Sequence, residues 1–253
     1  MKRDELTSFL NHLLRIDEFK DYCPNGLQVE GIDEIKKIAF SVSATKESID
    51  RAVEKNANAL VVHHGLFWHF HGTKPLIGPF AKRVRPLVLN NINLYGLHLP
   101  LDAHLEFGNA ASLAKELELT VDGPFGDYKG SPTGVIATFN QKVSASELKN
   151  QLTTAINHPV IHSCPSKNQD IQTIGIITGG ANSDWKLACE LGLDAYITGE
   201  ISEHDWHEAR EAGIHMFAGG HNATESFGIQ ALMKKVKERF EGECFFISSG
   251  NPA

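Results

Sequence analysis

The chain has 253 residues, of which 42% are hydrophobic and 22% charged. These values are typical of a soluble globular protein of one large or two ordinary domains. A formal net charge of −7 argues against a broad phosphate-binding surface. No stretch approaches the roughly 18 uninterrupted apolar residues of a membrane span, and the four cysteines form no CxxC pair. The composition therefore predicts a cytoplasmic protein with no membrane partner.

Helix and strand patterns alternate through the first half of the chain. An amphipathic N-terminal helix is followed by a turn-rich loop, CPNGLQVEG (23–31). We then expect strands at 37–45, 59–65 and 92–104 and helices at 48–57, 74–91 and 109–119. Pro86 should break or start the helix within 74–91.

The second half repeats this order. We expect strands at 172–180, 194–202, 214–225 and 243–250, with helices at 183–192, 204–213 and 226–240. Between the halves, Ser144 and Glu147 form a capping box for one more helix. The Gly- and Pro-rich segment 124–134 is the predicted domain boundary. It divides the chain into lobes 1–125 and 126–253, with the C-terminal helix and strand free to pack back on the first lobe.

This alternation predicts an α/β fold of two similar lobes, each with a mixed, largely parallel sheet covered by helices. Two alignments support a repeat. A shift of 136 residues lays 52–65 over 188–201 and places His64 on Glu200. A shift of 123 places His98 on His221 and Asp102 on Glu225. The alternative is coincidence, because helix–strand repetition is common in α/β proteins.

Four polar motifs lie where predicted strands end: HHG (63–65), HLPLD (98–102), TGE (198–200) and GGHNATE (219–225). Open α/β sheets bind ligands at these strand ends. Imidazole and carboxylate groups suit Zn, Mn, Fe and Ni. The predicted ligand set of two divalent ions, with Glu225 as the bridging carboxylate, is His63, His64, Asp102, His221 and Glu225.

Each of these residues has a structural alternative. A single strand histidine is more often buried and hydrogen bonded than a metal ligand, and Asp102 or Glu225 could cap a helix. Adjacent histidines favour metal, because both rings need polar partners at the same strand end. We interpret His104 as a loop residue, and His204 and His207 as a solvated helix face. His12, His158, His162 and His215 are interpreted as structural.

Three further features give weaker indications. Trp68 and Phe67 either stack on a ligand ring or belong to the core. The ITGG segment (177–180) could place an anion at a helix start but lacks a phosphate-binding motif. Cys23, a single turn cysteine, is poor support for a nucleophile.

Five motifs together resemble the GTP cyclohydrolase 1 type 2 family, also called Nif-three-like proteins. They are NGLQVEG (25–31), VVHHG (61–65), NLYGLHLPLDAH with GNAASLA (93–114), ITGE (197–200) and GGHNATE (219–225). The resemblance runs from residue 20 to the C-terminus. It matches the short bacterial form, which lacks the large inserted domain of longer members.

This resemblance implies a dinuclear metal site in the cleft between two similar lobes and a toroidal homohexamer. The family's metal motifs fall on His63, His64, Asp102, His221 and Glu225, with His98 in a supporting role. The family name implies ring opening of GTP.

Two functions from different classes follow. The first is a hydrolase in which two metal ions activate water, with Glu200 or His98 moving protons, acting on a nucleotide or another small molecule. The second is a non-catalytic binding or regulatory ring that holds a nucleotide or single-stranded DNA. Lys/Arg segments at 82–85 and 234–239 could line such a ring, or could be ordinary solvated helix faces.

Overall fold

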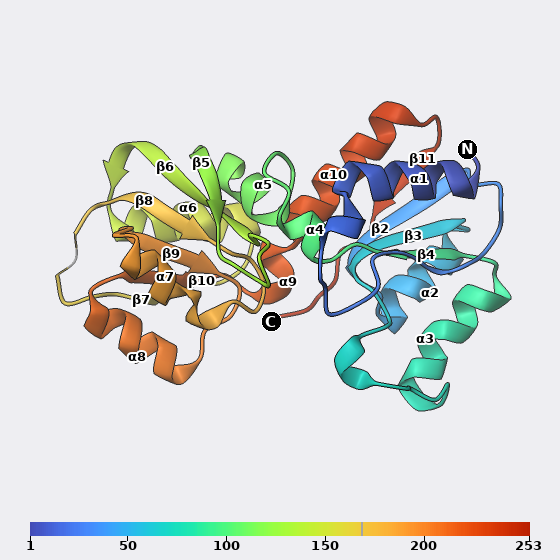
Figure 1. Cartoon of the computed structure of the whole chain (residues 1–253), viewed down its shortest axis with the longest axis horizontal. Helices are drawn as coiled ribbons and strands as arrows, with labels where there is room; N and C mark the ends of the chain where they lie inside the picture. The colour runs from blue at the N-terminus through green and yellow to red at the C-terminus, as the bar shows by residue number, and fades with distance from the viewer. Residues whose placement is uncertain (168) are drawn as a thin grey trace. The chain divides into compact units, whose positions relative to one another are not determined.

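Figure 1 shows the computed structural model of the chain, which describes residues 1–167 and 169–253. The chain forms two compact units. Unit 1 contains residues 1–101 and 229–250, and unit 2 contains residues 102–228 and 251–253. The chain therefore enters unit 2 after Leu101 and leaves it after Gly228. In the described part of the chain, no helix combines the length and the apolar character needed to cross a membrane.

Unit 1 is built on a five-stranded sheet with the order β1-β4-β3-β2-β11. Strands β2, β3, β4 and β11 run parallel, and β1 is antiparallel at the edge. The C-terminal strand β11 thus joins the sheet that begins near the N-terminus. The elements are α1 (Arg3–Leu14), η1 (Ile16–Glu18), β1 (Gly26–Val29), β2 (Lys37–Ser43), α2 (Lys46–Glu54), β3 (Ala59–His64), η2 (His69–His71), α3 (Gly78–Leu89), β4 (Asn93–Gly96), α4 (Leu99–Asp102, ending at the boundary), most of α10 (Ser226–Arg239), and β11 (Glu243–Phe246).

Helices cover both faces of this sheet (Figure 1). Leu60 and Val62 of β3 pack with Ile49 of α2 and Phe80 of α3 in one buried cluster. Val61 is fully buried as well, and strand alternation turns it to the opposite face, the side of α1 and α10. Because both faces are covered, β3 is an apolar run without a polar residue until His63.

Unit 2 contains a six-stranded sheet with the order β5-β6-β8-β9-β10-β7. Strands β8, β9 and β10 are parallel, and the remaining pairs are antiparallel. One buried cluster joins this sheet to α5 and α6, and a second joins it to α7 and α8. The elements are α5 (Asn109–Glu116), β5 (Thr120–Phe125), β6 (Gly134–Val143), α6 (Ala145–Ile156), β7 (Ile161–Ser163), β8 (Ile171–Ile176), η3 (Asn182–Asp184), α7 (Trp185–Glu190), β9 (Ala195–Thr198), α8 (Glu203–Ala212), β10 (His215–Ala218) and α9 (His221–Thr224).

Three local features differ from the sequence-based expectation. The segment 23–31 contains a strand, β1, because its backbone pairs with β4 although its sequence is rich in turn residues. Segment 124–134 connects the paired strands β5 and β6 within unit 2, so residues 102–125 belong to the second unit. Helix α3 continues through Pro86 to Leu89, since only one backbone N–H is lost near its end.

The two sheets repeat the same arrangement of strands. Each has three parallel neighbours, β2-β3-β4 and β8-β9-β10, followed by an antiparallel edge strand, β1 or β7. Ile38 pairs with Ala59 in unit 1, and Ile174 pairs with Ala195 in unit 2, both offset by 136 residues. Ala59 then pairs with Asn93, and Ala195 with His215. The repeat inferred from the sequence is therefore present in the strand register, with the 136-residue shift reproduced and the second shift 122 residues within the strands, one fewer than the 123 that aligns His98 with His221.

Side-chain hydrogen bonds repeat as well. The Asn58 side-chain oxygen accepts bonds from the N–H groups of Lys36 and Lys37, each at 3.0 Å. Asp194, 136 residues later, accepts bonds from the N–H groups of Gln172 and Thr173, each at 2.9 Å. In both units one polar side chain thus satisfies two backbone donors where the first parallel strand begins.

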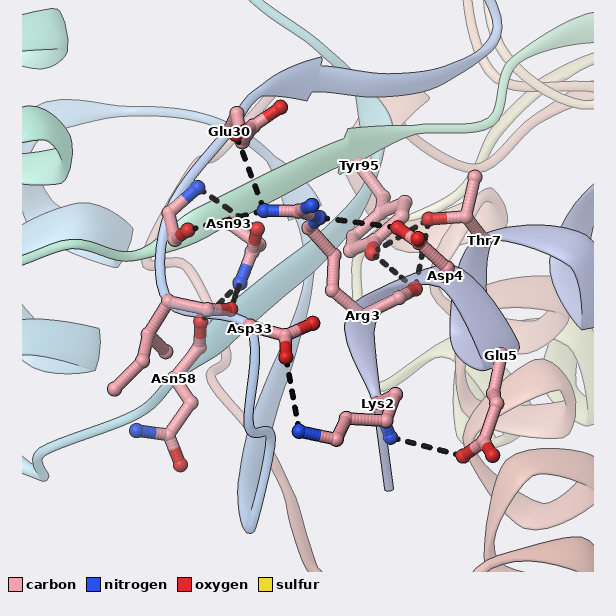
Figure 2. Close-up of polar contacts among 12 residues, drawn as sticks. Lys2, Arg3, Asp4, Glu5, Thr7, Glu30, Asp33, Asn58, Asn93 and Tyr95 are labelled. Atoms are coloured by element: carbon pink, nitrogen blue, oxygen red, sulfur yellow. Dashed lines mark hydrogen bonds and ion pairs between the residues drawn. The ribbon is translucent and has the colours of Figure 1, made fainter.

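Figure 2 shows the polar contacts that attach the N-terminus to unit 1. Lys2 forms an ion pair with Asp33 at 2.9 Å, and Arg3 forms one with Glu30 at 3.2 Å. Thr7 on α1 shares a 3.0 Å hydrogen bond with the hydroxyl of Tyr95 on β4. The Lys2–Asp33 pair is exposed and contributes little to stability, whereas the Arg3 side chain is largely covered.

The repeated hydrogen bonds make a testable prediction. We expect Asp194→Ala to lower the free energy of unfolding by about 2–3 kcal/mol, because two backbone N–H groups lose a charged acceptor. Asn58→Ala should cost less, about 1–2 kcal/mol, because its lost acceptor is neutral. Urea denaturation measures both, with the exposed Glu211→Ala as control. Wild-type stability in both variants would contradict this role.

Candidate metal centre

Three histidines of unit 1 gather where β3 and β4 end. His63 and His64 are the last residues of β3, and His98 lies two residues beyond β4. One ligand atom from each ring lies within 4.8 Å of those of the other two. The ring centroids of His63 lie 4.5 Å from His64 and 5.0 Å from His98. Although β3 alternation sends the adjacent side chains to opposite faces, their rings approach each other at the strand end.

Each of the three rings has an oxygen beside its Nδ1 atom. The Nδ1 of His63 lies 3.0 Å from the carbonyl oxygen of Leu97, and that of His64 lies 2.9 Å from the hydroxyl of Ser43. A carbonyl oxygen only accepts, so Nδ1 of His63 carries the proton and Nε2 is the nitrogen able to coordinate a cation. Metal-binding histidines are oriented in this way in most proteins.

His98 is oriented by Asp21, a residue that sequence reasoning missed. Its Nδ1 donates to the Asp21 carboxylate at 2.7 Å. Asp21 also accepts bonds from the Asn25 amide and the Leu99 N–H, both at 2.9 Å. Burial alone would raise the pKa of Asp21, but the bonds from His98, Asn25 and Leu99 hold the pKa below its ordinary value. Asp21 is therefore an ionised carboxylate that fixes the His98 ring.

Gly65, the third residue of HHG, leaves space for a neighbouring side chain. A Cβ at Gly65 would lie 2.2 Å from the Gln28 side-chain oxygen, and a Cβ at Gly96 would lie 2.4 Å from its nitrogen. The same Gln28 oxygen accepts a 2.9 Å bond from the Leu66 N–H, and its nitrogen donates to Pro24. Gln28 of β1 thus ties the loop after His64 to the sheet, which requires glycine at both positions.

In unit 2, one histidine lies between two carboxylates. The Nδ1 of His221 lies 2.6 Å from Glu200, and its Nε2 lies 3.2 Å from Glu225. Glu225 is almost fully buried, with 4% of its side chain exposed, whereas Glu200 is about half exposed. Burial lowers the pKa of His221, but hydrogen bonds and charges from Glu225 and Glu200 outweigh it and raise the pKa to about 9.

Two glycines of unit 2 make room for this trio. At Gly179, where φ is +70°, a Cβ would lie 2.2 Å from Glu225. At Gly199 a Cβ would lie 2.8 Å from the His221 Cα. The ITGG segment, interpreted from sequence as a place for an anion, therefore lies close against the buried Glu225 carboxylate of the chain itself.

Asp102 is the first residue of unit 2 and the last of α4. Its carboxylate accepts a 2.8 Å hydrogen bond from Asn109, which in turn accepts one from the Gly228 N–H at 2.8 Å. Asn109 thereby connects Asp102 to the segment three residues beyond Glu225. Like Asp21, Asn109 carries no signal in a single sequence that marks it as part of a site.

The remaining predicted candidates lie in simpler environments. His104 stacks on Phe107 with centroids 3.6 Å apart, as expected of a loop residue. His207 pairs with Glu203 on an exposed face of α8. Burial, with added repulsion from Asp21, raises the pKa of the Cys23 thiol, which makes it a poor nucleophile at neutral pH.

The chain is similar over its whole length to several known proteins. Residues 1–252 match the family described as Duf34/NIF3 (NGG1p interacting factor 3). Proteins named GTP cyclohydrolase 1 type 2 homolog from Vibrio cholerae and Escherichia coli K12 are 41% and 40% identical, and each alignment covers the whole of both chains. Two solved structures, also matched over both whole chains, are a structural genomics protein of unknown function, ybgI (40% identity, TM-score 0.93), and TTHA1606 of Thermus thermophilus (30%, 0.90).

The Asp21–His98 pair makes a prediction about metal affinity. We expect Asp21→Asn to weaken binding of Zn²⁺ or Mn²⁺ by about tenfold, because His98 packs against the ligand His63 and loses the carboxylate that orients its ring. Isothermal titration calorimetry measures the change, and Asp17→Asn on an exposed turn is the control. Equal affinities for Asp21→Asn and the wild type would contradict this role.

The raised pKa of His221 predicts a pH dependence. Below about pH 9 His221 carries a proton that a metal ion must displace. The apparent affinity should therefore rise by up to about tenfold per pH unit from pH 7 and level off above the pKa. Glu200→Gln removes one stabilising carboxylate and should move the levelling point to lower pH. Chelator competition between pH 6.5 and 10 tests this, and an affinity unchanged over that range would contradict it.

Proposed function

The chain belongs to the Duf34/NIF3 family, and on that premise we propose that it is a hydrolase dependent on two divalent metal ions. The proposed ligands are His63, His64, Asp102, His221 and Glu225. The proposal is carried by one observation, that imidazoles held through Nδ1 gather at the strand ends of unit 1. Rings held in this way leave Nε2 as the coordinating atom.

The donor atoms fit divalent transition metals. Unit 1 offers imidazole nitrogen, and unit 2 offers one imidazole with the Asp102 and Glu225 carboxylates. Such nitrogen and oxygen sets suit Zn, Mn, Fe or Ni, whereas structural zinc sites usually contain cysteine. A buried carboxylate such as Glu225 is costly unless it is paired with positive charge, which a metal ion supplies in addition to His221.

Chain connectivity supports a shared centre with ligands from both units. His98 of unit 1 and Asp102 of unit 2 are four residues apart, so their Cα atoms lie within about 14 Å in any conformation of the chain. At the second crossing between the units, Glu225 lies three residues before Gly228, where the chain leaves unit 2. Two of the five proposed ligands, Asp102 and Glu225, thus lie next to the crossings, and the supporting His98 lies beside the first one.

Two bound ions would supply Lewis acidity, which lowers the pKa of water and stabilises negative charge on a substrate. In the proposed mechanism His63, His64 and His221 orient through their Nδ1 partners, so little rearrangement is needed during reaction. Glu200 holds Nδ1 of His221, and its exposed side can accept a proton from water. His98 lies beside these ligands, and its hydrogen bond to Asp21 fixes the orientation of its ring.

An aromatic loop beside the histidines supports a substrate with a planar ring. Trp68 packs edge-on against His98 at 5.2 Å and lies 5.9 Å from His64. Phe70 lies 5.6 Å from Trp68 with its ring tilted by 31°, and 68% of Phe70 is exposed. Exposed rings of this kind stack on nucleobases. For a purine nucleotide such as GTP, hydrolysis would open the imidazole ring at C8.

Self-association is part of the proposal. Apolar side chains are exposed at both ends of α3. Leu76 and Ile77 directly precede the helix, and Val88 and Leu89 are its last two residues. Exposed apolar residues grouped in this way are typical of interaction surfaces. They support assembly into the homohexamer that the family resemblance implies.

The alternative is a non-catalytic ring that binds a nucleotide or single-stranded DNA. Lys82, Arg83 and Arg85 are exposed on α3 and favour contact with phosphate. The two functions differ in whether a metal-loaded protein turns a substrate over. A DNA affinity that does not change with salt would exclude the electrostatic part of this alternative.

A pair of variants tests the hydrolase. Glu225→Gln should lose both metal content and activity, because a bridging carboxylate is removed. Glu200→Gln at saturating metal should keep the ions and lose activity, because the proton acceptor is removed while the Gln amide oxygen can still accept from Nδ1 of His221. Metal analysis and a screen of nucleotides and phosphoesters measure both effects, with exposed Glu203→Gln as control. Hydrolysis by metal-stripped protein at the rate of the loaded form would contradict the proposal.

A further inference from the structure

Unit 2 contains a second group of metal-binding side chains apart from those discussed above. His162 lies on β7, Cys164 directly follows that strand, and His215 begins β10. One ligand atom from each of the three lies within 4.8 Å of the others. From sequence alone, both histidines are interpreted as structural, and Cys164 is one of four cysteines that form no CxxC pair.

Strand register explains why the three side chains meet. Strands β7 and β10 are antiparallel, with His162 opposite Phe217 and Ser163 opposite Met216. One step further in this register Cys164 comes opposite His215. Because side chains alternate along a strand, His162, Cys164 and His215 lie on the same face of the pair. His162 stacks flat on Phe217 there, with centroids 4.2 Å apart.

The spacing of the nitrogens fits one metal ion. Nε2 of His162 lies 3.1 Å from Nδ1 of His215. Two nitrogens bound to one tetrahedral Zn²⁺ at about 2.0–2.1 Å would lie roughly 3.3 Å apart, so little movement is required. Nε2 of His215 lies 3.1 Å from the Gln169 carbonyl oxygen and must donate to it. His215 Nδ1 therefore carries a lone pair, and its other nitrogen has the backbone partner common among metal ligands.

Comparison with unit 1 separates structural from additional features. The position equivalent to His215 is Asn93, which accepts a 2.8 Å bond from the Gly31 N–H and donates to the Ile32 carbonyl. The position equivalent to His162 is Leu27, opposite Tyr95. In unit 1, Asn93 alone holds the loop that follows the edge strand β1, without a histidine or a thiol beside it. In unit 2, His215 holds the loop after β7 in the same way, so His162 and Cys164 are additional to this structural role.

We propose that His162, Cys164 and His215 bind one thiophilic divalent cation, Zn²⁺ in the cell, with the fourth tetrahedral position open to water. On binding, Cys164 releases its thiol proton to solvent and coordinates as the thiolate. The His162 proton moves from Nε2 to Nδ1, and Nε2 coordinates together with Nδ1 of His215. The ion cross-links β7 to β10 and is independent of the proposed hydrolytic centre, which has no sulfur ligand.

Cadmium and cobalt titrations of the full chain test this site. Both ions form thiolate charge-transfer bands in the near ultraviolet, which nitrogen and oxygen ligands do not produce. We expect the wild type to develop a saturable band and Cys164→Ser to develop none. His162→Ala should retain the band, but with an affinity for the metal ion lower by at least about tenfold. Substitution of a residue that only orients a metal ligand already costs about tenfold or more, and His162 is a proposed ligand.

Matched controls identify the sulfur atom. Cys189→Ser, a partly buried thiol of α7, should leave the band unchanged. Cys23→Ser should also leave it unchanged, although Cys23 lies near His98. Circular dichroism confirms folding, and Cys164→Ala is the second variant if Cys164→Ser unfolds. A wild type without the band, a band that persists without Cys164, or a band lost in Cys23→Ser would each overturn the proposal.

Discussion

The candidate centre depends on the hydrogen bond that one nitrogen of each imidazole shares with a neighbouring oxygen atom. A free imidazole rotates and exchanges its proton between two nitrogens, which makes it a poorly defined ligand. An oxygen beside Nδ1 fixes the ring and directs Nε2 outward. Four such contacts are present: His63 with Leu97, His64 with Ser43, His98 with Asp21, and His221 with Glu200.

These contacts depend on the strand arrangement that the two units share. In each unit three parallel strands end at one sheet edge, and the loops that follow carry the polar residues. The chemistry of the equivalent positions differs. His64 of unit 1 corresponds to Glu200 of unit 2, and His98 corresponds to His221. One strand arrangement therefore presents mainly nitrogen donors in unit 1 and adds carboxylate donors in unit 2, and glycines keep the space around both sets open.

Much of the fold follows from sequence periodicity, because apolar runs and amphipathic helices are local signals. The alternation of strands and helices, the two mixed sheets and the repeat were predicted and are present. The motif residues could be selected because they end strands. Strand β1 was missed, since a four-residue edge strand is defined by pairing with β4 rather than by its own composition. The continuation of α3 past Pro86 was missed for a similar reason, because burial of Leu87 beyond the proline compensates for one lost hydrogen bond.

Partners distant in sequence could not be predicted. Asp21 and His98 are 77 residues apart, and nothing in DYCPNG indicates which side chain its carboxylate contacts. The same applies to His162 and His215, which meet only through the register of β7 and β10. Such pairs are brought together by strand order and register, which cannot be read from the local pattern of one sequence.

The central claim is that ligands from both units hold the same pair of metal ions. Anomalous diffraction from crystals of the metal-loaded protein tests it most directly. The account predicts two peaks about 3.5–4 Å apart, coordinated by His63 and His64 together with Asp102, His221 and Glu225. Peaks coordinated by residues of only one unit, or located away from these five residues, would contradict it.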